Sequence, residues 1–142
     1  MTAARSLPAP LAPPLPVLLA RRAERDPEGV LIECVDGGGY TNAAFHTDAL
    51  RFAYGLRELG IGPGDRVAVM LDATPLAHVC WIGTTWLRAW EVPVNTDFRG
   101  SSLQHALADS GAATNFSSQS LSDSLRSEKD DSRLRWWPRR KS

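Results

Sequence analysis

The sequence predicts an α/β fold in which a β-hairpin and helices precede a parallel βαβ unit. Residues 30–35 are rich in β-branched and apolar side chains and lie just before three glycines, the pattern of a strand that turns into a hairpin. Residues 66–71 are apolar on both faces, as in a parallel strand covered on both sides. A helical pattern and a short strand at 91–94 follow, so we expect a right-handed crossover and assign the α/β class.

Residues 1–16 hold five of the ten prolines and predict a flexible, extended arm, because proline fixes φ and lacks an amide proton. Residues 17–25 form a predicted short helix that ends at Asp26-Pro27. After the strand at 30–35, the glycines at 37–39 turn the chain back. Three glycines after a strand could also cradle a phosphate, but their spacing is not G-x-G-x-x-G, so the turn is favoured.

A long helix is predicted to start after Thr41, whose hydroxyl is expected to cap its first turn. Apolar side chains recur in it at three- and four-residue steps and predict one buried stripe: Phe45, Ala49, Phe52, Ala53, Leu56 and Leu59. Gly60 suits the left-handed position after the helix end. Residues 62–65 then favour a type II turn before the apolar strand at 66–71.

The crossover helix is predicted to begin at Pro75 with Thr74 as its cap. Its buried stripe is expected to contain Leu76, Val79, Cys80, Gly83, Trp86, Leu87 and Trp90. Gly83 within this stripe indicates close contact with a neighbouring element. In the strand at 91–94, Pro93 would be unfavourable at a fully paired central position.

A last helix is predicted from the capping-box spacing of Ser101 and Gln104. It ends near Asp109, with Gly111 as its stop. Residues 113–142 then lose all hydrophobic periodicity and contain eight serines, and their end is rich in arginine and tryptophan. We expect this segment to be a disordered tail, because it can bury too little apolar surface to offset chain entropy.

The composition excludes several classes of protein. The 142 residues carry 16 basic and 16 acidic side chains, so no net charge draws the chain to nucleic acid or anionic lipid. No apolar run is long enough to predict a membrane-spanning helix. Two cysteines form no disulfide framework, which favours a reducing compartment and a cytoplasmic location.

Few residues of the chain are candidates for chemistry. The polar segments 72–74 and 95–97 follow two parallel strands, where α/β sheets bind ligands. Because no catalytic group converges on them, a plain structural role is favoured. The remaining candidates are His46, His78, His105, Cys34 and Cys80. The histidines lie on three separate helices without metal-ligand spacing, and neither cysteine has a local activating partner. We therefore assign no catalytic, cofactor-binding or metal-binding residue.

The middle of the chain nevertheless resembles a known family. The segments that carry this likeness are Tyr40-Thr41, the run 56–71 (LRELGIGPGDRVAVML), Pro93-Val94-Asn95, residues 103–107 and Asp109-Ser110-Gly111-Ala112. They are similar, over about residues 17–112, to the opening of AMP-forming acyl-CoA synthetases, members of the adenylate-forming superfamily. Residues 91–100 most resemble the carnitine- or fatty-acid-CoA ligase branch, which implies fatty acid metabolism. The implied fold is an incomplete N-terminal subdomain of these enzymes.

The resemblance implies a two-step reaction that uses ATP, Mg and coenzyme A. A carboxylate forms an acyl-adenylate, and a thiol then takes the acyl group. The family needs a Ser/Thr/Gly-rich loop that ends in Pro-Lys-Gly and a further lysine in a mobile C-terminal domain. Only Lys129 and Lys141 occur here, and Gly83-Thr84-Thr85, which is similar to part of the loop, lies in a predicted helix.

We therefore expect a truncated ligase that is inactive alone, binds no cofactor by itself and has low stability. The tail at 113–142 is interpreted as foreign sequence that replaces the family's next strand. Two alternatives remain. The chain could be a non-catalytic module that docks on a full-length ligase, or self-associates, through an exposed sheet edge. It could also bind nucleic acid through its basic tail, although such charge runs are usually only solvated.

Overall fold

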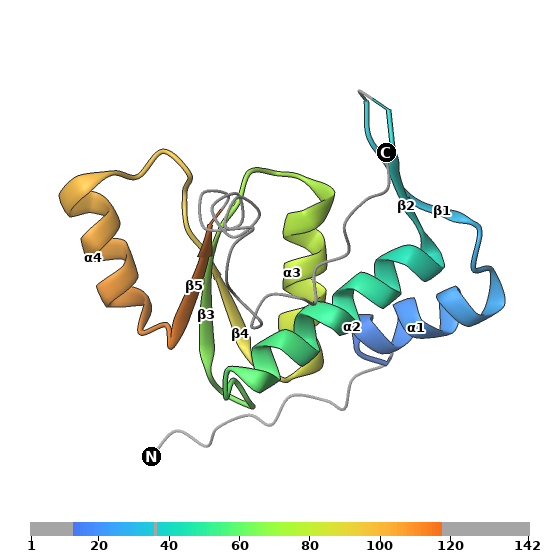
Figure 1. Ribbon diagram of the computed structural model, residues 1–142, viewed down its shortest axis with the longest axis horizontal. Helices are drawn as coiled ribbons and strands as arrows, with labels where there is room; N and C mark the ends of the chain where they lie inside the picture. The colour runs from blue at the N-terminus through green and yellow to red at the C-terminus, as the bar shows by residue number, and fades with distance from the viewer. Residues whose placement is uncertain (1–12, 36, 118–142) are drawn as a thin grey trace, which may run out of the picture.

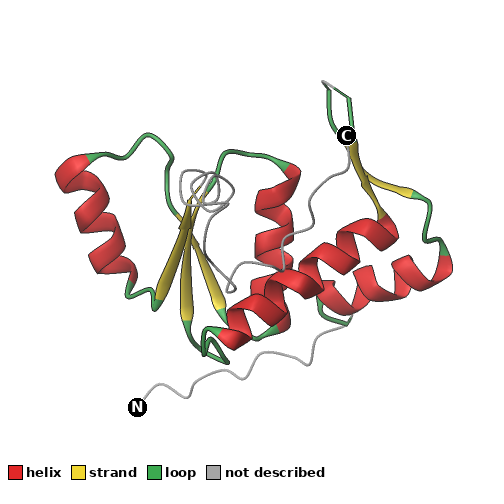
Figure 2. Ribbon diagram, in the orientation of Figure 1, coloured by secondary structure: helices red, strands yellow, loops and turns green. Residues whose placement is uncertain are grey.

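The computed structural model describes residues 13–35 and 37–117 (Figures 1 and 2). Residues 1–12 of the predicted arm (1–16) and residues 118–142 of the predicted tail (113–142), including its basic end, lie outside the described residues. In chain order the elements are α1 (Leu15–Arg25), β1 (Val30–Glu33), β2 (Gly39–Thr41), α2 (Asn42–Glu58), β3 (Arg66–Met70), α3 (Pro75–Trp86), β4 (Trp90–Pro93), α4 (Gly100–Ser110) and β5 (Thr114–Ser117). This order confirms the α/β class.

The glycine run forms a turn. β1 and β2 pair antiparallel, with Val30 opposite Thr41 and Ile32 opposite Tyr40, so the predicted hairpin is confirmed. A Cβ on Gly39 would lie 2.0 Å from the carbonyl oxygen of Ile32, and φ there is +149°, so a larger residue would be strained. The glycines therefore form the turn of the hairpin.

Two helices lie beside the hairpin. α1 begins at Leu15, two residues before the predicted start, and buries Pro16 near its N-terminus. α2 begins as predicted, because the amide of Ala44 donates to Oγ1 of Thr41 at 3.2 Å. The predicted α2 stripe is buried except at Leu59, which is 62 % exposed because it lies beyond the helix end.

A parallel sheet with strand order β4-β3-β5 forms the second part of the fold. α3 connects β3 to β4, so the predicted βαβ unit is confirmed. β5 contradicts the predicted start of a disordered tail at residue 113, because Thr114–Ser117 form a strand. It pairs in parallel with β3 from Val67–Thr114 to Met70–Ser117. Backbone pairing needs no apolar run, so the polar sequence Thr-Asn-Phe-Ser can complete the sheet where Phe116 reaches the core.

The hydrophobic core lies between one face of this sheet and helices α2 and α3 (Figure 1). Val67 and Val69 face it from β3, and the rings of Phe52 and Phe116 meet edge to face, 5.2 Å apart. A Cβ on Gly83 of α3 would lie only 2.7 Å from the carbonyl oxygen of Ala49 in α2. This contact confirms the expected close approach at Gly83.

Trp90 was predicted to lie on the α3 stripe, and this is wrong. α3 ends at Trp86, and Trp90 is the first residue of β4 and 66 % exposed. Trp90 lies four residues after the end of the helix, so the helical period no longer predicts which way its side chain points. β4 is an edge strand, which explains how it accommodates Pro93.

α4 covers part of the opposite face of the sheet (Figure 1). It begins at Gly100 with Arg99 at the cap position and no side-chain cap, so the predicted capping box of Ser101 and Gln104 does not form. Its stop is confirmed, because Gly111 adopts the left-handed conformation at φ 59°. None of the α4 residues is buried.

Candidate functional site

The candidate site lies at the carboxyl ends of β3 and β4, where the sequence places the two polar segments. The structure brings these segments together, because Oγ1 of Thr96 donates a hydrogen bond to Oδ1 of Asp72 at 2.8 Å. Asp72 follows β3 closely, and Thr96 follows β4. The parallel arrangement of the strands is what makes two residues 24 positions apart neighbours.

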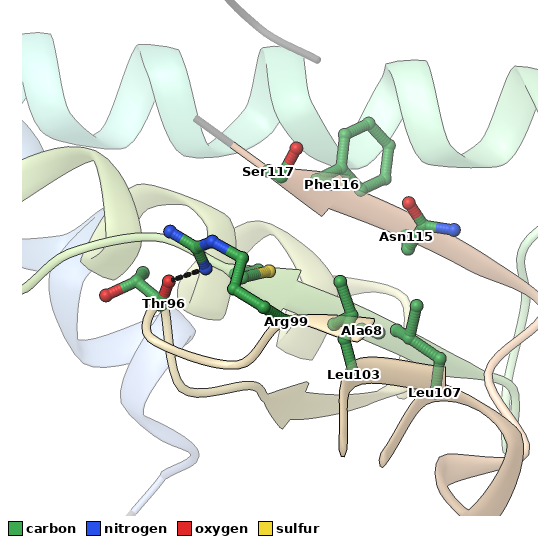
Figure 3. Close-up of a pocket in the computed structure, with 9 residues that line it drawn as sticks. Ala68, Thr96, Arg99, Leu103, Leu107, Asn115, Phe116 and Ser117 are labelled. Carbon is green, nitrogen blue, oxygen red and sulfur yellow. Dashed lines mark hydrogen bonds between the residues drawn. The ribbon is translucent and has the colours of Figure 1, made fainter. Parts of the chain in front are cut away.

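A cavity of about 180 Å³ opens beside this pair, between the sheet and α4 (Figure 3). β3, β5 and α4 supply its walls, and Thr96 and Arg99 lie at its loop end. The residues that line these walls are Ala68, Met70, Leu103, Leu107, Asn115, Phe116 and Ser117. The cavity is therefore mostly apolar at its base and polar at one end.

The polar groups at the loop end are already engaged with the loop. Nη1 of Arg99 donates to the carbonyl oxygen of Phe98 at 2.7 Å and also to that of Thr96. Oδ1 of Asn95 accepts from the amide of Asp97 at 2.8 Å. These bonds fix the chain between β4 and α4. They support the structural role that was favoured from the sequence.

A nucleoside triphosphate does not fit this site. Small-molecule pockets usually measure about 300–1,000 Å³, which is well above the 180 Å³ found here. Among the described residues that line the cavity, Arg99 is the one cation, and it bonds to backbone carbonyl groups. In the described part of the chain no group of three His, Cys, Asp or Glu side chains could hold a metal ion. Neither ATP with Mg nor coenzyme A therefore has a matching set of residues at this cavity.

The histidines do not converge. Nδ1 of His78 lies 3.0 Å from the carbonyl oxygen of Thr74 within its own helix. The ring of His46 lies 6.0 Å from that of Trp86, and its Nδ1 is buried without a partner among the described residues. His105 lies on the exposed surface of α4. The three side chains thus occupy three separate elements and form no common site.

Cys80 is a buried core residue. Burial, with a smaller contribution from the charge of Glu91, raises the pKa of its thiol to about 12. Because the thiolate is the reactive form, this shift favours the unreactive thiol of Cys80 at neutral pH. Next to it, the fully buried hydroxyl of Thr84 donates to the carbonyl oxygen of Cys80 at 2.8 Å. Gly83-Thr84-Thr85 is therefore helical and forms no phosphate loop.

One ionisable group, Glu91, is not among the candidates that the sequence offers. Glu91 lies opposite the buried Val67 in the β3–β4 register and shares its face of the sheet. Burial raises the pKa of its carboxyl group to about 7. Its Oε2 atom is buried and has no hydrogen-bond partner in the described part of the chain. The alternation of Trp90, Glu91 and Val92 would have revealed this placement once the strand register was known.

Within residues 13–35 and 37–117, no helix is both long and apolar enough to cross a membrane.

The comparisons with known proteins agree on one family. The model of the AMP-binding enzyme family matches residues 19–136. This match continues past residue 112, where the sequence analysis ended the resemblance. Two curated feruloyl-CoA synthases, from an Amycolatopsis and a Streptomyces species, are each 36 % identical over 93 residues, which is 66 % of this chain. The chain spans only 19 % of the length of these relatives.

Solved structures show the same fold. The inhibitor-bound N-terminal domain of FACL13 from Mycobacterium tuberculosis aligns with 81 % of this chain at a TM-score of 0.66 and 28 % identity. The N-terminal subdomain of Klebsiella oxytoca NpsA with 3-hydroxybenzoyl-AMSN aligns with 76 % at a TM-score of 0.67 and 21 % identity. The chain covers 30 % and 27 % of those two chains. The fold predicted from the resemblance is thereby confirmed.

Proposed function

The chain belongs to the AMP-binding enzyme family, and from this premise we propose that it is part of the N-terminal domain of an AMP-forming carboxylate–CoA ligase. Its described elements match the N-terminal domain of a family member at 28 % identity. Its curated relatives are named for the synthesis of an acyl-CoA. The proposed reaction of the whole enzyme is ATP-dependent formation of an acyl-adenylate, followed by transfer of the acyl group to coenzyme A.

We propose that this chain alone forms no acyl-adenylate. The observation that carries this proposal is that the family's nucleotide-binding sequence motifs do not occur in the chain. The sequence has no Ser/Thr/Gly-rich loop that ends in Pro-Lys-Gly, and its only lysines are Lys129 and Lys141. Within the described part of the chain, the cavity beside the polar strand ends measures about 180 Å³, and the side chain of Arg99 that lines it bonds to the backbone.

The proposed substrate of the whole enzyme is a carboxylic acid. The names of the relatives favour ferulate, an aromatic acid. The likeness of residues 91–100 to fatty-acid-CoA ligases favours an aliphatic acid instead, and with it a role in fatty acid metabolism. The proposed location is the cytoplasm. Its support is the pair of free cysteines at Cys34 and Cys80.

ATP–pyrophosphate exchange tests the absence of adenylation. The full chain is assayed with ferulate, benzoate and a medium-chain fatty acid, and the Amycolatopsis feruloyl-CoA synthase serves as the active control. Circular dichroism confirms that the chain is folded in the assay buffer. We expect exchange equal to the rate without enzyme. Exchange above that rate, which grows with the concentration of the chain, would overturn the proposal.

A further inference from the structure

A second groove lies between helices α2 and α3 and encloses about 140 Å³. It shares no lining residue with the cavity at the strand ends. The residues that line it are Leu50, Ala53, Tyr54 and Arg57 of α2 and Trp86 and Leu87 at the end of α3. We call this surface the helix groove. It lies on a part of the molecule that the proposed function does not use.

The helix groove has an apolar base and an exposed aromatic rim. Ala53 is only 5 % exposed and forms its floor, while Trp86 and Leu87 pack against the core. Tyr54, in contrast, is 55 % exposed. The guanidinium carbon of Arg57 lies 4.7 Å from the centroid of the Tyr54 ring, a cation–π contact that orients the ring. Two aromatic rings and a cation thus line one apolar groove.

This lining suits a polyproline II ligand. Such a chain makes no internal hydrogen bonds, so its carbonyl groups remain free to accept. Proline-rich segments with P-x-x-P spacing bind in aromatic-lined grooves for this reason, since the proline rings pack on the aromatic side chains. In the helix groove, the guanidinium of Arg57 and the hydroxyl of Tyr54 supply hydrogen-bond donors beside the rings.

The chain itself carries a segment of this kind. Residues 7–12, here called the arm segment, read Leu-Pro-Ala-Pro-Leu-Ala and contain no charged side chain. Pro10 and Pro13 have the P-x-x-P spacing. The arm segment lies outside the described residues, and the chain after it enters the fold at Pro14, the N-cap of α1. Its composition therefore matches the ligand that the helix groove suits.

The point of entry lies close to the helix groove. α1 contacts both α2 and α3 and runs antiparallel to α2 (Figure 1). Nε of Arg22 donates to Oδ1 of Asn42 at 2.9 Å, so the last turn of α1 lies at the start of α2. Pro14 precedes Arg22 by as many residues as Leu50 follows Asn42, which is about 12 Å along each helix. The chain thus enters the fold about level with Leu50, where the groove begins.

The arm segment is also long enough to fill the groove. Along α2 the groove extends from Leu50 to Arg57, about 10 Å of helix. Six residues of polyproline II span about 19 Å, at about 3.1 Å each. A short tether gives an effective concentration of about 1 mM, so a Kd of about 0.1 mM fills the groove in about nine molecules of ten.

We infer that the arm segment binds in the helix groove of its own chain as a polyproline II strand. Its prolines pack against Tyr54 and Trp86, and its carbonyl groups accept hydrogen bonds from Arg57. The groove is then occupied within the molecule and is closed to proline-rich segments of other proteins. This inference does not rest on the proposed function, because no nucleotide or acyl group takes part in it.

Paramagnetic broadening in NMR spectra of the full chain tests the inference. A nitroxide label is attached at residue 9 through Ala9→Cys in a chain that also carries Cys34→Ser. Cys80 stays unlabelled, because it is buried. We expect the amide signals of residues 53–57 to lose their intensity and those of α4 to keep theirs.

Two variants remove the contact from its two sides. Tyr54→Ala removes the exposed ring, and the double change Pro8→Ser and Pro10→Ser weakens the polyproline II conformation without touching the described fold. Each should restore the signals of residues 53–57. Trp81→Ala is the matched control, because Trp81 is also exposed but does not line the groove, and it should leave the broadening unchanged. Circular dichroism verifies that each variant is folded.

Three outcomes would overturn the inference. Broadening that is absent or spread evenly over the surface would mean that the arm segment has no fixed site. Equal effects of Tyr54→Ala and Trp81→Ala, or no effect of the proline changes, would place its contact elsewhere. Broadening of an isotope-labelled chain by a separate spin-labelled chain, lost on dilution, would assign the groove to the arm of a second copy.

Discussion

Gly83 is the residue at which the packing of the two central helices is most sensitive. A Cβ there would lie 2.7 Å from the carbonyl oxygen of Ala49 and 2.9 Å from Cδ1 of Phe52. Ala49 and Phe52 are themselves 0 % and 1 % exposed, so neither can move aside easily. The glycine therefore permits the close approach of α3 to α2.

We expect Gly83→Ala to lower the free energy of unfolding by about 1–3 kcal/mol, the usual cost of overpacking a core. Alanine is favoured over glycine in a helix by about 1 kcal/mol, so the overpacking must exceed this gain. Urea unfolding followed by circular dichroism measures the difference. Unchanged or increased stability would show that α2 and α3 do not meet this closely.

Glu91 should make stability depend on pH. Its pKa is about 7 in the folded chain, where burial raises it, against about 4.3 for an unfolded glutamate. Between these values the folded state binds more protons than the unfolded state. The stabilising contribution is therefore complete below about pH 4.3 and is lost as the pH rises through 7.

Glu91→Gln should remove this loss. The variant should gain stability relative to the wild type between pH 5 and pH 8, measured as the shift in the urea midpoint. Glu33→Gln on β1 removes the same charge from an exposed position and should show no such gain. If both variants respond alike, the carboxyl group of Glu91 is not buried in solution.

At the scale of elements, two threonines at helix starts provide a matched pair. Thr41 and Thr74 both occupy the N-cap position with extended backbone. The hydroxyl of Thr41 accepts from the amide of Ala44, whereas Thr74 makes no side-chain cap bond. A threonine at the N-cap position therefore does not cap a helix by its position alone. Its side chain must also adopt a rotamer that brings the hydroxyl within hydrogen-bonding distance of a free amide.

Thr41→Ala should cost about 0.5–2 kcal/mol of stability, the usual value for a lost cap. Thr74→Ala should cost less than Thr41→Ala, because it removes no cap bond. The urea midpoints of the two variants and the wild type, measured under the same conditions, show which variant loses more stability. A larger loss at Thr74 would contradict the bonding pattern.

The elements differ in how well the sequence predicts them. Helix α2 and strand β3 are predicted well, because their apolar periods and their bounding residues are local signals. β5 is missed because its pairing with β3 is non-local and its sequence is polar apart from Phe116. Trp90 is misplaced because the helical period was extended past the end of α3. At the site, both polar segments are predicted, but their hydrogen bond depends on the strand register.

At the scale of the whole molecule, the small size of the folded part should limit stability. Even complete domains of 60 to 150 residues bury only about 60–70 % of the surface that the unfolded chain exposes. Here a tryptophan that is 66 % exposed and a cavity of about 180 Å³ lie on one side of the sheet. A partner that covers this side binds the folded chain and not the unfolded one. It must therefore stabilise the fold by mass action.

This linkage gives the last prediction. At a free partner concentration of 100 times its Kd, the folded chain should gain about 2.7 kcal/mol, and its melting temperature should rise with the partner concentration. The partner is the Amycolatopsis feruloyl-CoA synthase without the 93-residue segment that this chain matches, and melting is followed with a fluorophore attached to the chain. Trp90→Lys should need a roughly 30-fold higher partner concentration for the same rise. Trp81 is also an exposed tryptophan, at 47 %, but lies on α3, so Trp81→Lys should follow the wild-type curve. A melting temperature that does not change with partner concentration would mean that the rest of the domain does not cover this side of the sheet.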